Sequence, residues 1–231
     1  MTIVRAKEKG NLVVISGPSG AGKGTVINKL LEMNENLYLS ISETSRSIRG
    51  QEQDGVEYYF VTKEEFRKRI QDNKYLEYAI YNSNYYGTPK DRINEMLNKG
   101  IDVILEIEIQ GAVKVKELIP DALFIFIMPT SLKELKKRII GRKTETQEKV
   151  VERFKRAYQE INEASKYNYV VVNDEVEKAA MKVNSIIHAE KCRVDRIEEI
   201  YLNNLEEEIH ELLIDKDFNN LEREIGWKRM F

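Results

Sequence analysis

Four short apolar runs, separated by longer stretches of helical periodicity, form the main pattern along the chain. They cover residues 11–15, 102–107, 122–128 and 168–173, and they do not alternate between apolar and polar positions. Uninterrupted apolar strands are typical of a parallel sheet that helices cover on both faces. The pattern therefore predicts an α/β fold built on a doubly wound parallel sheet with right-handed crossovers.

Helix boundaries are marked between these runs. Thr62-Lys-Glu-Glu65 and Ser131-Leu-Lys-Glu134 have the spacing of capping boxes, which begin helices. Pro89 suits the first position of a helix, and Lys99-Gly100 suits the end of one. These signals place helices between the predicted strands, as the fold requires.

Two segments interrupt this alternation. Residues 38–88 show a pattern of short strands and are rich in tyrosine, which predicts an inserted antiparallel lobe that we call the acceptor lobe. Residues 140–153 form an irregular, charged stretch that we interpret as a lid. We expect one domain over 1–191, consisting of the core, this acceptor lobe and the lid, followed by a helical extension at 192–231. The tyrosines of the lobe are Tyr58, Tyr59, Tyr75, Tyr78, Tyr81, Tyr85 and Tyr86.

A glycine-rich loop directly follows the first apolar run. Its residues are Gly17, Pro18, Ser19, Gly20, Ala21, Gly22, Lys23, Gly24 and Thr25. Strand, glycine loop and helix are the context of a phosphate-binding loop, in which backbone N–H groups and a lysine surround an anion. The residue after the lysine is Gly24 and the hydroxyl follows at Thr25, a form that resembles nucleoside monophosphate kinases. We expect the whole loop to bind ATP.

Composition limits the remaining classes of function. The chain has 231 residues and a formal net charge of −2, so nothing indicates nucleic-acid or membrane binding. Cys192 is the only cysteine, which excludes a disulfide framework and a multi-cysteine metal site. Without an apolar run of 18 residues or a signal-peptide pattern, we expect a cytoplasmic protein.

A second anion site is indicated inside the lobe. Arg46 and Arg49 lie three residues apart, and two guanidinium groups can bind a second phosphate bidentately. Tyr58 and Tyr86 are candidate phenolic donors. Hydroxyl residues surround the arginines, namely Ser42, Thr44 and Ser45.

Several motifs in order resemble the guanylate kinase family from about residue 10 to about residue 190. They are Ser42-Glu-Thr-Ser-Arg46 with Arg49, residues 54–61, residues 76–79, Asn84-Tyr-Tyr-Gly-Thr-Pro89, residues 105–111, Arg138 with Arg142, and residues 172–174. The resemblance implies transfer of the γ-phosphate of ATP to GMP, with Mg²⁺, and with ATP and GMP as the small-molecule partners. Thr25 is the candidate for a direct Mg²⁺ contact, and no protein metal site is certain.

The resemblance also implies residue roles for GMP. Arg46, Arg49, Tyr58 and Tyr86 match the ligands of the acceptor phosphate, whereas Ser42, Glu77 and Thr88 match the guanine contacts. Guanine presents N1–H beside its 2-amino group, and a carboxylate such as Glu77 can accept from both. Adenine lacks this donor pair, and its binding would leave a buried Glu77 unpaired.

On the ATP side, the resemblance implies that Arg138, Arg142 and Arg153 close on the ATP phosphates. The candidate catalytic residues are these three arginines together with Lys23 of the loop and Arg46 of the acceptor site. Phosphoryl transfer mainly needs positioning and neutralisation of charge, which lysine, arginine and Mg²⁺ supply. Asn173 matches the adenosine side of the family, although a helix cap would explain the neighbouring Asp174 equally well.

Three positions depart from the family pattern: Ser45 replaces threonine, Ile48 replaces proline, and Glu108 replaces aspartate. Because glutamate is one methylene longer, a base contact by Glu108 is less secure than one by Glu77. Alternatively, Glu106 and Glu108 position Mg²⁺ through water.

Two other functions stay open. One is a related P-loop kinase for another small phosphate acceptor, and the other is a guanylate-kinase-like scaffold that binds phosphopeptides. The intact Lys23 loop and the lid arginines favour an enzyme over the scaffold. A GTPase fits poorly because no Asn-Lys-x-Asp motif follows a strand.

The extension beyond residue 191 carries an apolar stripe at helical spacing. Its members are Val194, Ile197, Tyr201, Leu205, Ile209 and Leu212. An uncovered stripe would promote association, so we expect the chain's own core or a second subunit to cover it, and we favour the second, a homodimer.

Overall fold

The structure is a computed structural model that describes residues 4–5, 9–140, 147–194 and 199–200. Contacts divide the chain into a main unit, Glu8–Arg193, and a second unit formed by Met1–Lys7 and Val194–Phe231. Each unit is considered by itself below.

The main unit is built on a five-stranded parallel sheet with the order β10-β9-β2-β8-β3. The four predicted strands are confirmed within one residue at each end. The fifth strand is a three-residue segment that the pattern did not reveal. The strands are β2 (Leu12–Ser16), β3 (Leu37–Leu39), β8 (Asp102–Glu106), β9 (Leu123–Pro129) and β10 (Tyr169–Asn173).

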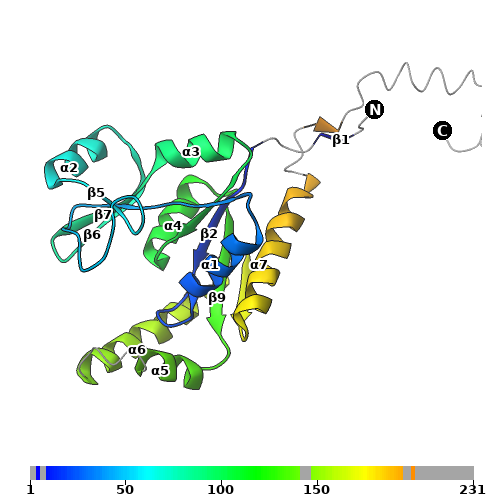
Figure 1. Ribbon diagram of the computed structural model, residues 1–231. Coiled ribbons are helices and arrows are strands. Elements are labelled where there is room, and N and C mark those ends of the chain that lie inside the picture. Colours follow the sequence, from blue (N-terminus) through cyan, green and yellow to red (C-terminus); the bar gives the residue numbers. More distant parts are fainter. Residues whose placement is uncertain (1–3, 6–8, 141–146, 195–198, 201–231) are drawn as a thin grey trace, which may run out of the picture. The chain divides into compact units, whose positions relative to one another are not determined.

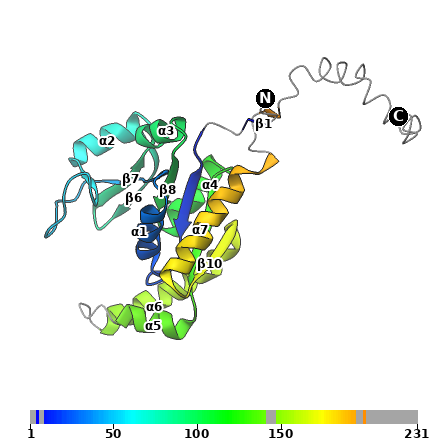
Figure 2. The same cartoon turned by 45° about the vertical axis from the view of Figure 1, so that its right-hand side comes forward.

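Both faces of the central strands β2, β8 and β9 are buried, which is why these strands are mostly apolar, whereas the edge strand β10 exposes Val170 and Val172. Val13 and Ile15 of β2 pack with helices α1 (Lys23–Met33) and α7 (Val176–Lys191), whereas Leu12 and Val14 pack on the opposite face with α3 (Lys90–Asn98) and α4 (Ile109–Leu118). Figures 1 and 2 show α1 and α7 together on one side of β2. The doubly wound α/β architecture is thereby confirmed.

A second, four-stranded sheet with the order β5-β4-β7-β6 forms the inserted lobe. Its pairs β4–β7 and β6–β7 are antiparallel, but β4–β5 is parallel, so the sheet is mixed rather than purely antiparallel. Its elements are β4 (Glu43–Thr44), β5 (Tyr59–Phe60), helix α2 (Lys63–Gln71), β6 (Tyr75–Tyr81) and β7 (Asn84–Pro89).

The tyrosines of the lobe have several structural tasks. Phe66 of α2 is fully buried, and the rings of Tyr75 and Tyr85 stack on it at 4.2 and 5.2 Å between centroids. The hydroxyl of Tyr75 donates to the buried carboxylate of Glu43, to which Arg69 also donates. Tyr75 and Tyr85 therefore build the core of the lobe with Phe66, whereas Tyr78 and Tyr81 are exposed.

The predicted helix boundaries are confirmed, except that the start of α3 is shifted by one residue. Thr62 and Ser131 accept the N–H groups of Glu65 and Glu134, as capping boxes predict. Gly100 follows the end of α3 with a φ of 77°. Pro89, however, precedes the first residue of α3 as its N-cap instead of occupying the first helical position.

Helices α5 (Leu132–Ile140) and α6 (Gln147–Ile161) pack on each other through Leu135, Ile139 and Ala157. A 3₁₀ turn, η1 (Asn162–Lys166), leads from α6 to β10. Residues 141–146 of the predicted lid, including Arg142, lie outside the described residues.

In the second unit, β1 (Val4–Arg5) pairs antiparallel with β11 (Glu199–Ile200). The predicted helix of the extension therefore does not run through residues 199–200, which are extended. Val194 is 72% exposed, and the other members of the apolar stripe lie outside the described residues. Over the part of the chain that the structure describes, no helix combines the length and the apolarity that crossing a bilayer requires.

Candidate active site

The glycine-rich loop connects β2 to α1 in a backbone path that its glycines permit. Gly20 and Gly22 have φ values of 90° and 87°, a region that other residues rarely adopt. A Cβ at Gly17 would lie 2.2 Å from the carbonyl oxygen of Ile127. Lys23, the first residue of α1, donates through Nζ to the carbonyl oxygen of Gly17 at 2.7 Å. The predicted strand–loop–helix context is confirmed.

Two predicted ATP-side residues support this loop from beneath. The side chain of Asn173, at the end of β10, is buried and donates through Nδ2 to the carbonyl oxygen of Ala21 at 2.8 Å. Arg138 of α5 donates to the same oxygen at 3.2 Å and to the carbonyl oxygen of Asn173 at 3.4 Å. Arg138 and Asn173 thus fix the loop, while their contacts with ATP stay predictions.

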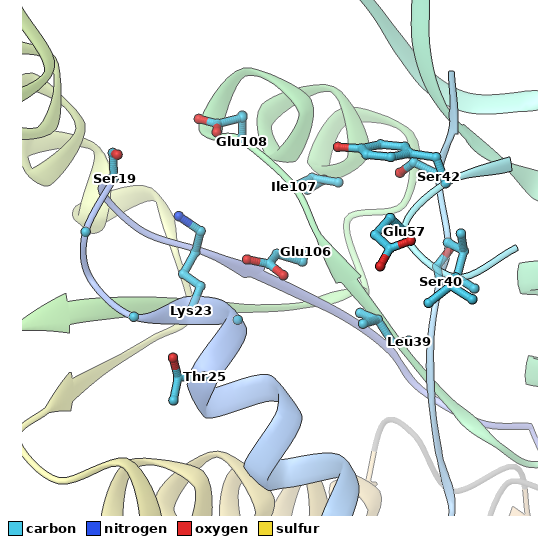
Figure 3. Close-up of a pocket in the computed structure, with 16 residues that line it drawn as sticks. Ser19, Lys23, Thr25, Leu39, Ser40, Ser42, Glu57, Glu106, Ile107 and Glu108 are labelled. Atoms are coloured by element: carbon cyan, nitrogen blue, oxygen red, sulfur yellow. The ribbon is translucent and has the colours of Figure 1, made fainter. Parts of the chain in front are cut away.

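A cleft of about 580 Å³ opens above the loop. In Figure 3, Lys23 reaches from the start of α1 into this space, with Glu106 beside it, Glu108 beyond it, and Ser42 and Glu57 across from it. The cleft is lined by Ser19, Gly20, Gly22, Lys23, Gly24, Thr25, Leu39, Ser40, Ile41, Ser42, Val56, Glu57, Tyr58, Glu106, Ile107 and Glu108. The loop and the inserted lobe therefore face one shared space.

Glu106 ends β8 at the floor of this cleft. Burial raises the pKa of its carboxyl above the usual range, and the nearby charge of Lys23 opposes that shift. Thr25 is exposed and also lines the cleft. Among the described residues, no group of three His, Cys, Asp or Glu side chains is arranged to hold a metal ion by itself.

The predicted phosphate cage is partly assembled in the lobe. The guanidinium of Arg46 lies 5.0 Å from the ring centre of Tyr58, whose ring meets that of Tyr86 edge-on at 5.9 Å. Arg46 is 9% exposed and makes a bidentate ion pair with Glu52, with both N–O distances at 2.6 Å. Arg49 is exposed, and its backbone N–H donates to the same carboxylate.

Two of the predicted guanine contacts, Glu77 and Thr88, form a pair within the second sheet, while Ser42 lines the cleft. Glu77 of β6 lies opposite Thr88 of β7, and the Thr88 hydroxyl donates to Glu77 Oε1 at 2.7 Å. Burial raises the pKa of Glu77 above its usual range, whereas the bond from Thr88 and the charge of Lys114 lower it. A Cβ at Gly111 would lie 3.3 Å from Glu77 Oε2, so the first turn of α4 approaches this carboxylate.

Helix α6 contributes charged groups on the loop side of the cleft. Arg153 donates to the Ser19 hydroxyl at 2.9 Å, and the carboxylate of Glu160 accepts the Ser19 backbone N–H at 3.1 Å. Arg156 donates to Glu160 at 2.9 Å and to Glu108 at 3.3 Å. Arg153 thus lies at the loop, while its contact with ATP stays a prediction, and Glu108 is mostly exposed and paired with Arg156.

Comparison with known proteins identifies the family. The sequence model described as "Guanylate kinase" matches residues 9–190. The chain belongs to the guanylate kinase family. A guanylate kinase of Clostridium tetani is 58% identical over 208 residues, covering 90% of this chain and 100% of that protein. A guanylate kinase of Clostridium perfringens (strain SM101 / Type A) is 54% identical over 215 residues, covering 93% of this chain and 100% of that protein.

A solved guanylate kinase agrees with this assignment. The crystal structure of guanylate kinase from Anaplasma phagocytophilum is 34% identical and gives a TM-score of 0.69, over 86% of this chain and 94% of that chain. The resemblance inferred from the sequence motifs, with its P-loop fold, is therefore confirmed.

Two departures from the guanylate kinase pattern have a visible structural setting. The Ser45 hydroxyl accepts the N–H of Tyr85 at 2.9 Å, so serine keeps a hydrogen bond at this position. Ile48 is 51% exposed, in the loop between the two predicted phosphate arginines. Serine therefore fits the lobe of this guanylate kinase without an unpaired hydroxyl.

The sequence patterns did not indicate three carboxylates that lie at this site. Glu52 pairs with Arg46, Glu160 holds the Ser19 N–H, and Glu57 lines the cleft. Glu52 and Glu57 lie in a loop without periodicity, and Glu160 is more than 130 residues from the loop that it contacts. The only available signal was opposite charge at Arg46 and Glu52, which is common on any polar segment.

Proposed function

We propose that this chain is an ATP:GMP phosphotransferase that converts ATP and GMP into ADP and GDP. The observation that carries the proposal is the shared cleft, in which the Lys23 loop faces Ser42 and Tyr58 of the lobe. Two anion-binding surfaces that face one space allow a donor and an acceptor phosphate to meet in line. Family membership and relatives that carry the name guanylate kinase support this choice of substrates.

GMP is selected by the lobe. The Glu77 carboxylate accepts N1–H and the 2-amino group of guanine, with Ser42 and Thr88 as further contacts to the base. The bond from Thr88 fixes one Glu77 oxygen before the base arrives. Arg46, Arg49, Tyr58 and Tyr86 receive the acceptor phosphate. Glu108 is a secondary candidate because its carboxylate is paired with Arg156.

ATP is bound by residues 17–25 and by the side of the cleft near Asn173. Backbone N–H groups at the start of α1 and the Lys23 ammonium stabilise the triphosphate. Arg138 and Arg153 already contact the loop, so little rearrangement brings their charge to the moving phosphoryl group. Arg142 is assigned the same task on the family motif alone. These charges oppose the negative charge that develops during transfer.

The residues present fit a Mg²⁺ ion that arrives with ATP. Thr25 supplies a hydroxyl, and Glu106 supplies a carboxylate at the cleft floor, both of which are hard oxygen donors. Because the described residues offer no three-carboxylate group, the ion is held mainly by phosphate oxygens and water. When bound, Mg²⁺ supplies neutralising charge between the phosphates.

The decisive assay measures ADP production from ATP with GMP, AMP, CMP or UMP offered separately. We expect turnover with GMP to exceed turnover with the other nucleotides by orders of magnitude, since only guanine satisfies Glu77. Lys23→Ala is the matched inactive control. Equal turnover with AMP would favour a different nucleoside monophosphate kinase, and nucleotide-independent phosphopeptide binding without turnover would favour a scaffold.

We also propose a cytoplasmic location, where both substrates are made and used, and a homodimer in solution. Support for the dimer is the apolar stripe of the extension, of which Val194 is strongly exposed. Size-exclusion chromatography with light scattering measures the mass directly, and a monomeric mass at micromolar concentration contradicts the dimer.

A further inference from the structure

The ion pair between the buried Arg46 and the half-buried Glu52 occupies an arginine that the proposed function needs for the acceptor phosphate. The Arg46 side chain is 8% exposed and that of Glu52 is 22% exposed, so the pair is not a surface contact. Glu52 also accepts the backbone N–H of Arg49 at 2.9 Å through the same oxygen that meets Arg46. One carboxylate therefore connects both predicted phosphate arginines.

The hydrogen bonds of Arg46 to Glu52 and Ser47 leave one edge of its guanidinium unused. An arginine has five N–H donors in a rigid plane. Nη1 donates to Glu52 Oε2 and to the carbonyl oxygen of Ser47, while Nη2 donates to Glu52 Oε1. Nε–H and the second N–H of Nη2 are not used by Glu52 or Ser47, and these two donors form a bidentate edge. The side chain of Tyr86, itself a predicted phosphate ligand, also hydrogen-bonds to the guanidinium.

From this geometry we infer that Glu52 is a positioning residue for the acceptor phosphate. It holds the Nη1–Nη2 edge of Arg46 so that the Nε–Nη2 edge is presented to the phosphate of GMP. The inference rests on the proposed function, because it takes Arg46 as a ligand of that phosphate. Tyr58 and Phe60 complete the arrangement, with ring centres 5.0 and 5.5 Å from the guanidinium carbon.

Electrostatics keep this pair intact over the physiological range. The hydrogen bond from Arg46 lowers the pKa of Glu52 to about 2, and the same bond raises the pKa of Arg46. Both groups stay charged at every pH at which the enzyme would operate. A fixed guanidinium loses little freedom on binding a phosphate, which favours affinity.

The first test compares GMP with guanosine, which carries the same base but no phosphate. Glu52→Gln keeps the size of the side chain but removes its charge and one acceptor oxygen. We expect the affinity for GMP to fall between about tenfold and a hundredfold, because a misplaced donor loses its phosphate bond. Affinity for guanosine should stay within about twofold. A merely structural role would weaken both ligands alike and overturn the inference.

A double-mutant cycle shows whether Glu52 acts through Arg46. In an Arg46→Gln background, Glu52→Gln should cause no further loss of GMP affinity, and this pair of neutral side chains also avoids a buried unpaired arginine. Glu52→Asp should recover part of the loss, since it restores the carboxylate. Glu64→Gln, on the exposed face of α2, is the matched control and should bind GMP as the parent protein does.

Three outcomes contradict the inference: additive losses in the cycle, equal losses for GMP and guanosine, or tighter GMP binding by Glu52→Gln. The last would mean that Glu52 competes with the phosphate instead of positioning its ligand. Failure of the proposed function looks different, since the parent protein itself would then produce no ADP with GMP.

Discussion

At the scale of single residues, Glu77 is the group whose chemistry decides which base is accepted. Its carboxylate is half-buried and accepts the Thr88 hydroxyl on one oxygen. Glu77→Gln keeps the volume but offers one acceptor oxygen in place of two. We expect GMP affinity to fall by about tenfold to a hundredfold, the worth of a charged hydrogen bond, with ATP affinity unchanged. Isothermal titration with each nucleotide measures both, and equal losses would contradict the two-site assignment.

Protonation of Glu77 gives a second prediction at this scale. Burial raises the pKa of Glu77 above its ordinary 4.5, so the group protonates at a higher pH in the folded chain than in the unfolded chain. Lowering the pH through this pKa therefore stabilises the fold at Glu77 but removes the acceptor that guanine needs. Guanosine affinity should fall about tenfold per pH unit below the pKa.

Guanosine is the right ligand for this titration because it carries no phosphate that ionises near neutral pH. The binding curves should be measured from pH 7 down to pH 4.5 for the parent protein and for Glu77→Gln. The variant has no ionisable group at this position and should show a flat profile. A profile that is the same in both proteins would assign the pH dependence to another group.

Lys23 is the residue through which the loop acts on the donor phosphates. Its Nζ is held by the Gly17 carbonyl at 2.7 Å, in the cleft beside Glu106. Lys23→Ala should lower the turnover number by on the order of 10²–10³, because it removes a cation that opposes charge in the transition state. GMP affinity should not change, since the lobe binds GMP. Single-turnover kinetics with GMP titration measure both quantities. Near-normal turnover by Lys23→Ala would contradict the phosphoryl-transfer mechanism.

At the scale of elements, the loop and α1 contain two glycines with opposite requirements. Gly22 has a φ of 87°, and a Cβ there would lie 2.5 Å from Asn173 Nδ2, whereas a Cβ at Gly24 would come no closer than 3.8 Å to Glu106. Gly22→Ala should destabilise the unliganded protein by at least about 1–2 kcal/mol. Gly24→Ala, inside α1, should stabilise it by up to about 1 kcal/mol.

Thermal unfolding of the two variants provides a matched comparison, since each adds one methyl group within the same loop–helix unit. We expect the Tm of Gly22→Ala to fall and that of Gly24→Ala to rise by a few degrees per kcal/mol. Shifts of the same sign would mean that the backbone conformation at Gly22 does not control the stability of this unit.

Elements could be predicted from the sequence where burial or glycine leaves a pattern. The strands 12–16 and 123–129 are long and apolar because helices cover both of their faces, and the glycine loop has no other common use. β3 and β4, with three and two residues, are too short for any periodicity. The Glu52–Arg46 and Glu160–Ser19 contacts depend on how loops and distant helices meet, which no local pattern records.

At the scale of the whole molecule, the end of α7 sets where the main unit can be cut. Asp102 is 1% exposed, and its Oδ2 lies 2.6 Å from Lys191 Nζ, although the two are not aligned as a hydrogen bond. Glu190 is also buried and lies 3.2 Å from Arg193 Nη1. A chain that ends at residue 190 would therefore leave two buried carboxylates without these cations.

We predict that a protein spanning residues 8–193 keeps phosphoryl transfer and loses only self-association, because every described site residue lies within the main unit. A protein spanning 8–190 should in addition be less stable by about 1–3 kcal/mol, because the two carboxylates lose their cations and keep hydrogen bonds from the Asn11 N–H and the Tyr169 hydroxyl, and this loss lowers the Tm by several degrees. Lys191→Ala in the full chain separates the ion pair from the truncation and should reproduce part of this loss.

Light scattering, thermal melts and the GMP assay test these predictions on four proteins: the full chain, 8–193, 8–190 and Lys191→Ala. If the protein spanning 8–193 formed the same oligomer as the full chain, residues 194–231 would not mediate association. If the proteins spanning 8–190 and 8–193 had the same Tm, the Asp102–Lys191 pair would contribute nothing to the stability of the fold.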